Sequence, residues 1–136
     1  MEKQHTIGKS VSISGTGLHT GQNGTLTFHP AEINHGIKFR RVDLFGQPIV
    51  EAKVKNVVDT SRGTTIAQNG VKVYTVEHIM ASLRGSGIDN VLIDLNCEEP
   101  PILDGSAKIM MAALKEAGIV EQDAERKCLK KKRKIT

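Results

Sequence analysis

A glutamate and a histidine stand side by side in the segment Thr75-Val76-Glu77-His78, at the predicted start of a helix. A carboxylate can take a proton from an attacking water, and an imidazole can ligate zinc. A helix start also favours an acidic side chain through the helix dipole, and a histidine can occupy an amphipathic face without any chemical role. The usual zinc pair of histidines four residues apart is missing, because position 82 is Ser82. The residue types alone leave a catalytic pair and an ordinary helix start both open.

His19 is a second candidate, because it lies in the glycine-rich segment Gly15-Thr16-Gly17-Leu18-His19-Thr20-Gly21. Glycine loops that cradle phosphate lead directly into a helix N-terminus. Here an alternating strand pattern follows, so a dinucleotide-binding loop is excluded. A plain connection between two strands explains the glycines. It does not explain His19, since a rigid glycine loop is better suited to present an imidazole than to pack one.

The remaining motifs call for no chemistry. Pro100-Pro101-Ile102-Leu103-Asp104-Gly105-Ser106 is typical of a turn followed by a helix cap. The basic run at residues 130–134 suits a localisation signal or an anchor to an anionic surface, although such runs are more often solvated tails. The chain shows no Ser/His/Asp constellation, P-loop or helix-turn-helix signature.

The first half of the chain has the alternating pattern of antiparallel strands, punctuated by glycine-containing turns. Strands are predicted at residues 9–14, 25–29, 37–42, 51–54, 64–67 and 72–74, with a hairpin-type turn at Gln68-Asn69-Gly70. A buried-looking strand is predicted at residues 91–95. The repeated alternation therefore indicates a mainly antiparallel sheet.

Two helices are predicted in the second half. We expect Thr75 to cap a helix over residues 76–83 that ends at Gly85 and Gly87, and Ser106 to cap a helix over residues 107–117 that Gly118 ends. Each helix has one apolar stripe, formed by Val76, Ile79, Met80 and Leu83 in the first and by Ile109, Met110, Ala113 and Leu114 in the second. The order of strands, helix, strand and helix predicts an α+β fold with both helices on one face of the sheet.

Composition narrows the class of protein. A chain of 136 residues suits one domain with a real core, and one Tyr, three Phe and no Trp make that core aliphatic. Seven of the 19 basic residues lie at or after Arg126, whereas residues 1–125 hold 12 basic and 15 acidic residues and so carry a net charge of −3. Without a basic body or aromatic stacking platforms, we expect no nucleic-acid partner.

The cysteines and the hydropathy point to a compartment. Cys97 and Cys128 form no metal-type pair, and the start of the sequence has no signal-peptide pattern. No apolar run approaches the roughly 20 residues that span a bilayer. We therefore expect a soluble, cytoplasmic protein without a transmembrane segment.

Taken in order, several short motifs are more specific than any of them alone. They are Gly17-Leu18-His19-Thr20-Gly21, Val58-Asp59-Thr60, Thr75-Val76-Glu77-His78, Gly87-Ile88-Asp89-Asn90-Val91 and Pro101-Ile102-Leu103-Asp104-Gly105-Ser106, with Glu98-Glu99-Pro100 before the last. From about residue 5 to residue 127 this series resembles the N-terminal half of the UDP-3-O-acyl-N-acetylglucosamine deacetylase family. Arg41-Val42-Asp43-Leu44 and Asp59-Thr60-Ser61-Arg62-Gly63-Thr64 are similar to the form of this enzyme that is fused to a 3-hydroxyacyl-carrier-protein dehydratase.

The resemblance implies two similar domains, each a small sheet packed on two helices, with the active site between them. It implies zinc-dependent hydrolysis of the N-acetyl group of UDP-3-O-(3-hydroxyacyl)-N-acetylglucosamine, a step of lipid A biosynthesis. By motif position Glu77 matches the general base and His78 a zinc ligand. His19, together with Thr60 and Ser61, matches the substrate-binding side of the site.

The resemblance also implies a partner. In the family the other zinc ligands, and the donor that stabilises the oxyanion, come from a second domain with a His-x-x-x-Asp motif and a later His, and the present 136 residues contain no such motif. We therefore expect residues 1–127 to form the first deacetylase domain, which would be inactive alone and prone to self-association through its uncovered face. The alternatives are a non-catalytic module with the same fold and a basic-tailed binding protein.

For residues 128–136 we expect a disordered basic tail, whose deletion would cost less than about 1 kcal/mol.

Overall fold

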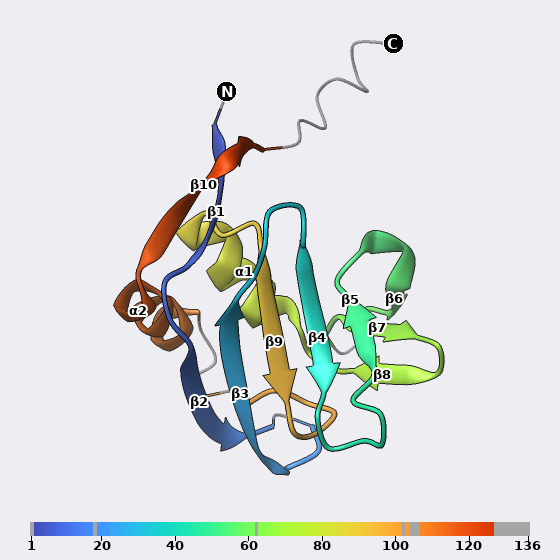
Figure 1. Ribbon diagram of the computed structural model, residues 1–136. Coiled ribbons are helices and arrows are strands. Elements are labelled where there is room, and N and C mark those ends of the chain that lie inside the picture. The colour runs from blue at the N-terminus through green and yellow to red at the C-terminus, as the bar shows by residue number, and fades with distance from the viewer. Residues whose placement is uncertain (1, 18, 62, 102, 104–106, 127–136) are drawn as a thin grey trace.

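The computed structural model describes residues 2–17, 19–61, 63–101, 103 and 107–126. Within these residues the chain forms two α-helices, three β-sheets and one short 3-10 turn (Figure 1). The predicted α+β class is confirmed. The predicted cap at Ser106 and the predicted tail at residues 128–136 lie outside the described residues.

The central layer is a five-stranded sheet. Its strands, in spatial order, are β2 (Val11–Thr16), β3 (Asn23–Pro30), β9 (Val91–Leu95), β4 (Ile37–Arg41) and β5 (Ile49–Glu51). All neighbouring pairs are antiparallel except β4 and β9, which run parallel (Figure 1). Side chains alternate between its faces, so Leu26 and Phe28 are fully buried. On the other face, the exposed hydroxyl pair of Ser12 and Thr27 bridges β2 and β3.

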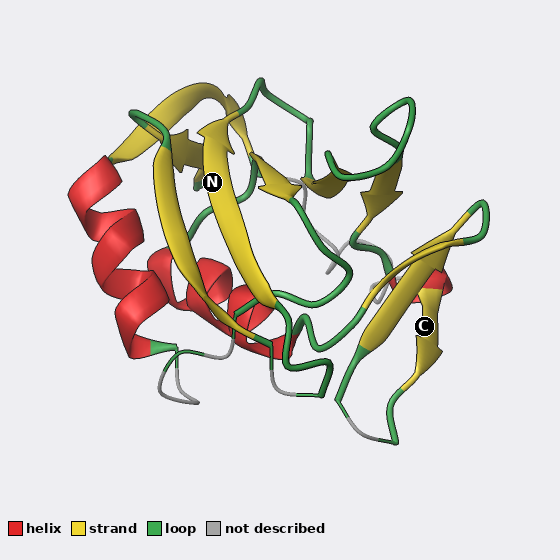
Figure 2. Cartoon of the chain, turned by 90° about the horizontal axis from the view of Figure 1, so that it is seen from below, coloured by secondary structure: helices red, strands yellow, loops and turns green. Residues whose placement is uncertain are grey.

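Both helices, α1 (Glu77–Ser86) and α2 (Lys108–Ala117), lie on one face of this sheet, as predicted (Figure 2). The core between the two layers is aliphatic apart from Phe28 and Phe39, and includes Leu26, Ile79, Leu83, Ile93, Met110 and Leu114. Each such buried side chain contributes roughly 1.5–3 kcal/mol. α1 ends as predicted, because Gly87 takes a left-handed conformation (φ 73°) and its N–H donates to the Arg84 carbonyl.

A small separate sheet packs beside the edge strand β5. It contains β6 (Val57–Asp59), β7 (Thr65–Gln68) and β8 (Val71–Val73), and a 3-10 turn (Val54–Asn56) leads into it. The predicted hairpin turn between β7 and β8 is confirmed, since Asn69 (φ 53°) and Gly70 (φ 81°) are both left-handed. The strand predicted at residues 51–54 is wrong, because β5 ends at Glu51 and the 3-10 turn begins at Val54.

A two-stranded ribbon of β1 (Lys3–Ile7) and β10 (Ile119–Glu125) completes the fold and brings the start of the chain beside residue 125 (Figure 1). The sequence pattern predicts neither strand. In β1 the buried positions include Gln4 and Thr6, which are polar, and β10 has no buried residue at all. Hydrophobic alternation is therefore absent from both.

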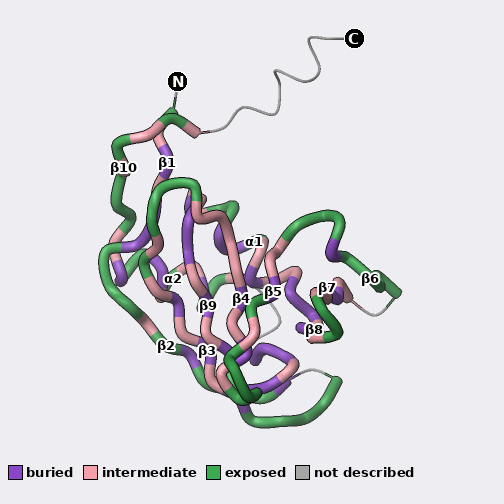
Figure 3. Tube along the Cα trace, turned by 45° about the vertical axis from the view of Figure 1, so that its right-hand side comes forward, coloured by how far each residue is buried: buried purple, intermediate pink, exposed green. Residues whose placement is uncertain are grey.

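Burial is uneven across the fold. The tube is buried along much of β9 and the neighbouring strands, whereas every residue of β6 is exposed (Figure 3). Within the described residues, neither helix has the length and apolar character that crossing a membrane requires.

Candidate functional site

The start of α1 differs from its prediction. Thr75 does not cap the helix; its hydroxyl donates to Oε2 of Glu99 at 2.6 Å, and its backbone is left-handed with φ 55°. The cap position belongs to Val76, which has no capping side chain. The predicted Thr75 cap is therefore wrong, and the physical reason is that a buried carboxylate binds the hydroxyl instead. The helix begins directly at Glu77.

Glu77 is half-buried and is held by backbone. One oxygen, Oε1, accepts the N–H of Thr64 at 2.8 Å. The other, Oε2, would lie 2.8 Å from a Cβ at position 63, and only Gly63 (φ 108°) leaves that space open. The carboxylate is therefore fixed on one side and has an oxygen left for a proton or a ligand.

His78 follows in the first turn of α1 and is also half-buried. Among the described residues its ring has no hydrogen bond or ion pair to another side chain. The imidazole is therefore a donor that no neighbour of the described chain has already engaged. Within the same residues no group of three or more His, Cys, Asp or Glu side chains is arranged to hold a metal.

His19 is exposed at the end of a loop that Glu99 anchors. Oε1 of Glu99 accepts the backbone N–H groups of both His19 and Thr20 at 2.8 Å. Burial raises the pKa of Glu99, but hydrogen bonds from Thr75, Thr20 and His19 outweigh it and hold the pKa below its ordinary value. Glu99 is thus an ionised carboxylate at the base of the loop.

A cavity of about 300 Å³ lies where these segments meet. His19, Asp59, Gly63, Tyr74 and Thr75 are among the residues that line it. Gly63 lies against the Glu77 carboxylate, so the cavity adjoins that carboxylate. The structure therefore brings the His19 loop and Thr75, two residues before α1, together, whereas His78 is not among the residues that line this cavity.

Thr60 and Ser61 do not line this cavity. Both are exposed in the turn after β6, where the N–H and hydroxyl of Ser61 donate to Oδ1 of Asp59 at 2.9 and 2.8 Å. Asp59 itself faces the cavity. The motifs of the sequence include Gly63 and Glu99 but assign them no role, whereas the structure places Gly63 against Glu77 and Glu99 against the His19 loop.

An apolar groove of about 340 Å³ has Glu77 in its lining. Val54, Val57, Ile66 and Met80 are among its lining residues, and Val54 is 90% exposed. Exposed apolar surface of this kind is typical of a contact surface for another protein segment or an apolar ligand. Glu77 therefore lines the apolar groove and adjoins the first cavity through Gly63.

Comparison with known proteins identifies the family to which the sequence is similar. The sequence model of the UDP-3-O-acyl N-acetylglycosamine deacetylase family (LpxC) matches residues 4–136. The Bifunctional enzyme LpxC/FabZ of Bacteroides thetaiotaomicron is 53% identical over 124 residues, which are 91% of this chain and 27% of that relative. The UDP-3-O-acyl-N-acetylglucosamine deacetylase of Saccharophagus degradans is 48% identical over 138 residues, covering 100% of this chain and 45% of the relative. The chain spans less than half the length of these relatives.

Proposed function

The chain belongs to the UDP-3-O-acyl N-acetylglycosamine deacetylase family, and from this premise we propose that it supplies one side of a zinc-dependent deacetylase site. The substrate would be UDP-3-O-(3-hydroxyacyl)-N-acetylglucosamine, an intermediate of lipid A biosynthesis, and the bond hydrolysed would be its N-acetyl amide. The observation that carries the proposal is the placement of Glu77 and His78 together at the start of α1, beside a cavity that His19 lines.

Glu77 would act as the general base. Hydrolysis of an amide requires a water to lose its proton as it attacks the carbonyl carbon, and a positioned carboxylate accepts that proton. The Thr64 N–H holds Oε1, so Oε2 is the oxygen that would receive the proton. The same Glu77 would then return the proton to the departing amine. Both transfers need a fixed carboxylate, which the Thr64 and Gly63 contacts provide.

His78 would be the zinc ligand of this chain. Its unengaged, half-buried imidazole fits that role, whereas one donor falls short of the three protein ligands that a catalytic zinc requires. Zinc, when bound, supplies a Lewis acid that polarises the amide carbonyl and makes water more acidic. The other ligands would come from a second domain, as would a donor to the oxyanion.

The cavity between the His19 loop and the turn after β6 would take the sugar portion of the substrate. Polar side chains in its lining, among them His19, Asp59 and Tyr74, offer hydrogen bonds to hydroxyl and amide groups. Thr60 and Ser61 would contact the substrate only at the rim, because they lie outside the lining. The apolar groove beyond Glu77 would receive the second domain.

The experiment is complementation. We expect the purified 136-residue chain to bind zinc only weakly and to release no detectable acetate from the UDP-sugar substrate. We expect a protein that joins this chain to the second domain of the Saccharophagus degradans relative to bind zinc stoichiometrically and to release acetate. Full activity of the chain alone, or a zinc-loaded joined protein without activity, would contradict the proposal and favour a non-catalytic module.

A further inference from the structure

Glu99 is a carboxylate buried to 0% exposure, and no salt bridge with a Lys, Arg or His neutralises it in the described part of the chain. A charge removed from water is tolerated only where hydrogen-bond donors replace that water. Glu99 therefore depends on its donors, and the identity of those donors shows which parts of the chain it joins.

One set of donors belongs to the His19 loop. The N–H groups of His19 and Thr20 both point at Oε1. Gly17 of the same loop also lies close to the carboxylate, since a Cβ at this position would lie 2.6 Å from the same Oε1. Only glycine at this position permits the approach. The backbone before and after His19 therefore lies against one oxygen of Glu99.

The other donor belongs to the start of α1. The Thr75 hydroxyl donates to Oε2 at 2.6 Å, while Thr75 takes the left-handed conformation that a β-branched residue rarely adopts. Its neighbours are fixed as well, because Tyr74 N–H donates to the Glu98 carbonyl at 2.8 Å and Val76 N–H to the Thr64 carbonyl at 3.0 Å. A strained residue persists where its surroundings enforce it, and here it aims the next two positions, Glu77 and His78.

We propose that Glu99 is a positioning residue that fixes His19 relative to Glu77 and His78, by binding the backbone of one segment with Oε1 and the hydroxyl of the other with Oε2. The effect of Glu99 on turnover rests on the proposed function. The effect of Glu99 on the relative position of the two segments does not, because both segments belong to this chain. The depressed pKa of Glu99 agrees with this role, since donors that favour the charged form come from both segments.

The geometric test uses nuclear magnetic resonance on the 136-residue chain. As pH falls from 7 to 3, the amide resonances of Thr20 and Thr75, which both bond Glu99, should share one transition with a midpoint below the usual range of a glutamate. In Glu99→Gln this shared titration should be lost, while in Glu116→Gln, which removes one exposed carboxylate from α2, it should remain. Independent titration of the two segments in the wild-type chain would overturn the proposal.

The kinetic test uses the protein joined to a second domain. Glu99→Gln and Thr75→Val should each lower kcat by roughly 10-fold to 100-fold with KM within about twofold, because misplaced catalytic groups cost turnover more than binding. Thr75→Ser keeps the hydroxyl and should retain near-wild-type kcat. Equal losses in Thr75→Ser and Thr75→Val, or unchanged kcat in Thr75→Val, would overturn it.

The two tests also separate this proposal from the proposed function. If the wild-type joined protein shows no deacetylation, the proposed function fails, and the shared titration in the chain alone still decides the role of Glu99. Should Glu99→Gln fail to fold, the Thr75→Val and Thr75→Ser pair decides it, since both variants keep the buried carboxylate.

Discussion

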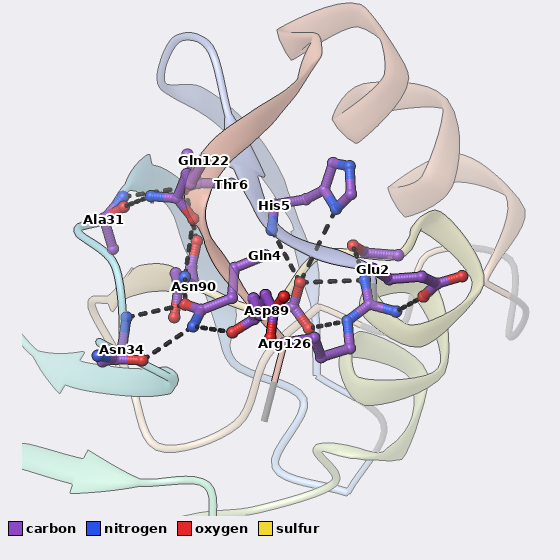
Figure 4. Close-up of polar contacts among 12 residues, drawn as sticks. Glu2, Gln4, His5, Thr6, Ala31, Asn34, Asp89, Asn90, Gln122 and Arg126 are labelled. Carbon is purple, nitrogen blue, oxygen red and sulfur yellow. Dashed lines mark hydrogen bonds and ion pairs between the residues drawn. The ribbon is translucent and has the colours of Figure 1, made fainter. Parts of the chain in front are cut away.

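Two regions depend on buried polar groups but use them differently: the ribbon junction, where Gln4 of β1 and Gln122 of β10 meet Asn90, and the start of α1. At the ribbon junction, the side chains of Gln4, Asn90 and Gln122 hydrogen-bond directly to one another at 2.7–2.8 Å (Figure 4). An ion pair between Arg126 and Asp89 at 2.9 Å extends this network. The same side chains also bond backbone groups, since Asn90 accepts the Gly36 N–H and Gln122 donates to the Ala31 carbonyl, so their polar atoms are occupied within the chain.

At the start of α1 most donors to the two carboxylates are backbone amides, and the Thr75 hydroxyl adds a side-chain donor. Glu99 holds the amides of His19 and Thr20, and Glu77 accepts one from Thr64. The ring of His78 finds no partner among the described side chains. The comparison teaches that a closed network stabilises a junction, whereas bonds to backbone fix the position of side chains whose own polar atoms stay available. The predictions below test this difference.

Asn90→Leu should have the largest effect, because Asn90 is buried and its side chain serves three partners. Its Oδ1 accepts the Gly36 N–H at 2.8 Å, and its Nδ2 donates to Gln4 and Gln122. Losing these bonds leaves buried groups unpaired, at a cost of about 3 kcal/mol. Urea unfolding followed by circular dichroism measures it. A loss below about 1 kcal/mol would show that the junction is not a closed network.

Gly63→Ala should lower turnover more than it lowers the stability of the fold. The new Cβ would meet Oε2 of Glu77 at 2.8 Å, so the carboxylate must move, and turnover of the joined protein should fall roughly 10-fold or more. Gly70→Ala is the matched control, because Gly70 is also left-handed (φ 81°) and a Cβ there would meet no atom within 4 Å. The control should lose about 1 kcal/mol of stability and keep its turnover. Equal turnover in both variants would contradict the assigned position of Glu77.

Glu99→Gln should make the unfolding free energy depend less strongly on pH in the acidic range. Because the pKa of Glu99 is lower in the folded chain than its ordinary value of 4.5, its charge stabilises the fold fully above that value. The contribution is lost as pH falls through 4.5 towards the lower folded pKa. The unfolding free energy of the variant should therefore fall less steeply between pH 5 and pH 3 than that of the wild-type chain. A steeper fall in the variant would contradict this account, because it would mean that the charged form of Glu99 destabilises the fold.

Thr27→Val should have the smallest effect. It removes the 2.8 Å hydrogen bond between the hydroxyls of Thr27 and Ser12 on the open face of the sheet, where water replaces the lost partner. We expect a change within about 0.5 kcal/mol in the same urea experiment. A loss of unfolding free energy as large as that of Asn90→Leu would contradict the difference between a buried network and a water-exposed hydrogen bond.

The elements that carry an apolar pattern were predictable from the sequence. Leu26 and Phe28 alternate with threonines and form the inner face of β3, and Ile79 and Leu83 form the buried stripe of α1. The ribbon was not predictable in this way, because Gln4 reaches the interior through hydrogen bonds rather than hydrophobicity. Periodicity reports hydrophobic burial, and it gives no signal for polar burial.

The site was predictable in part for a similar reason. Glu77, His78 and His19 stand out by residue type and motif, and the structure places the first two at the start of α1 and His19 in the lining of the neighbouring cavity. Glu99 does not stand out, because a buried carboxylate and a solvated one have the same sequence. Thr75 misled the prediction because a threonine before a helix usually caps it, whereas a tertiary contact with Glu99 prevails here. The only local sign was a glutamate followed at once by two prolines, outside any helix.

The most direct test of the central claim compares Glu77→Gln with His78→Ala in the joined two-domain protein, by measuring bound zinc and acetate release on the same samples. Glu77→Gln removes a proton acceptor and no metal donor, so zinc should remain stoichiometric while turnover falls by at least about 100-fold. His78→Ala removes a metal donor, so zinc affinity itself should fall, with turnover lost alongside it. Near-full turnover in Glu77→Gln, or undiminished zinc affinity in His78→Ala, would contradict the roles assigned to this pair.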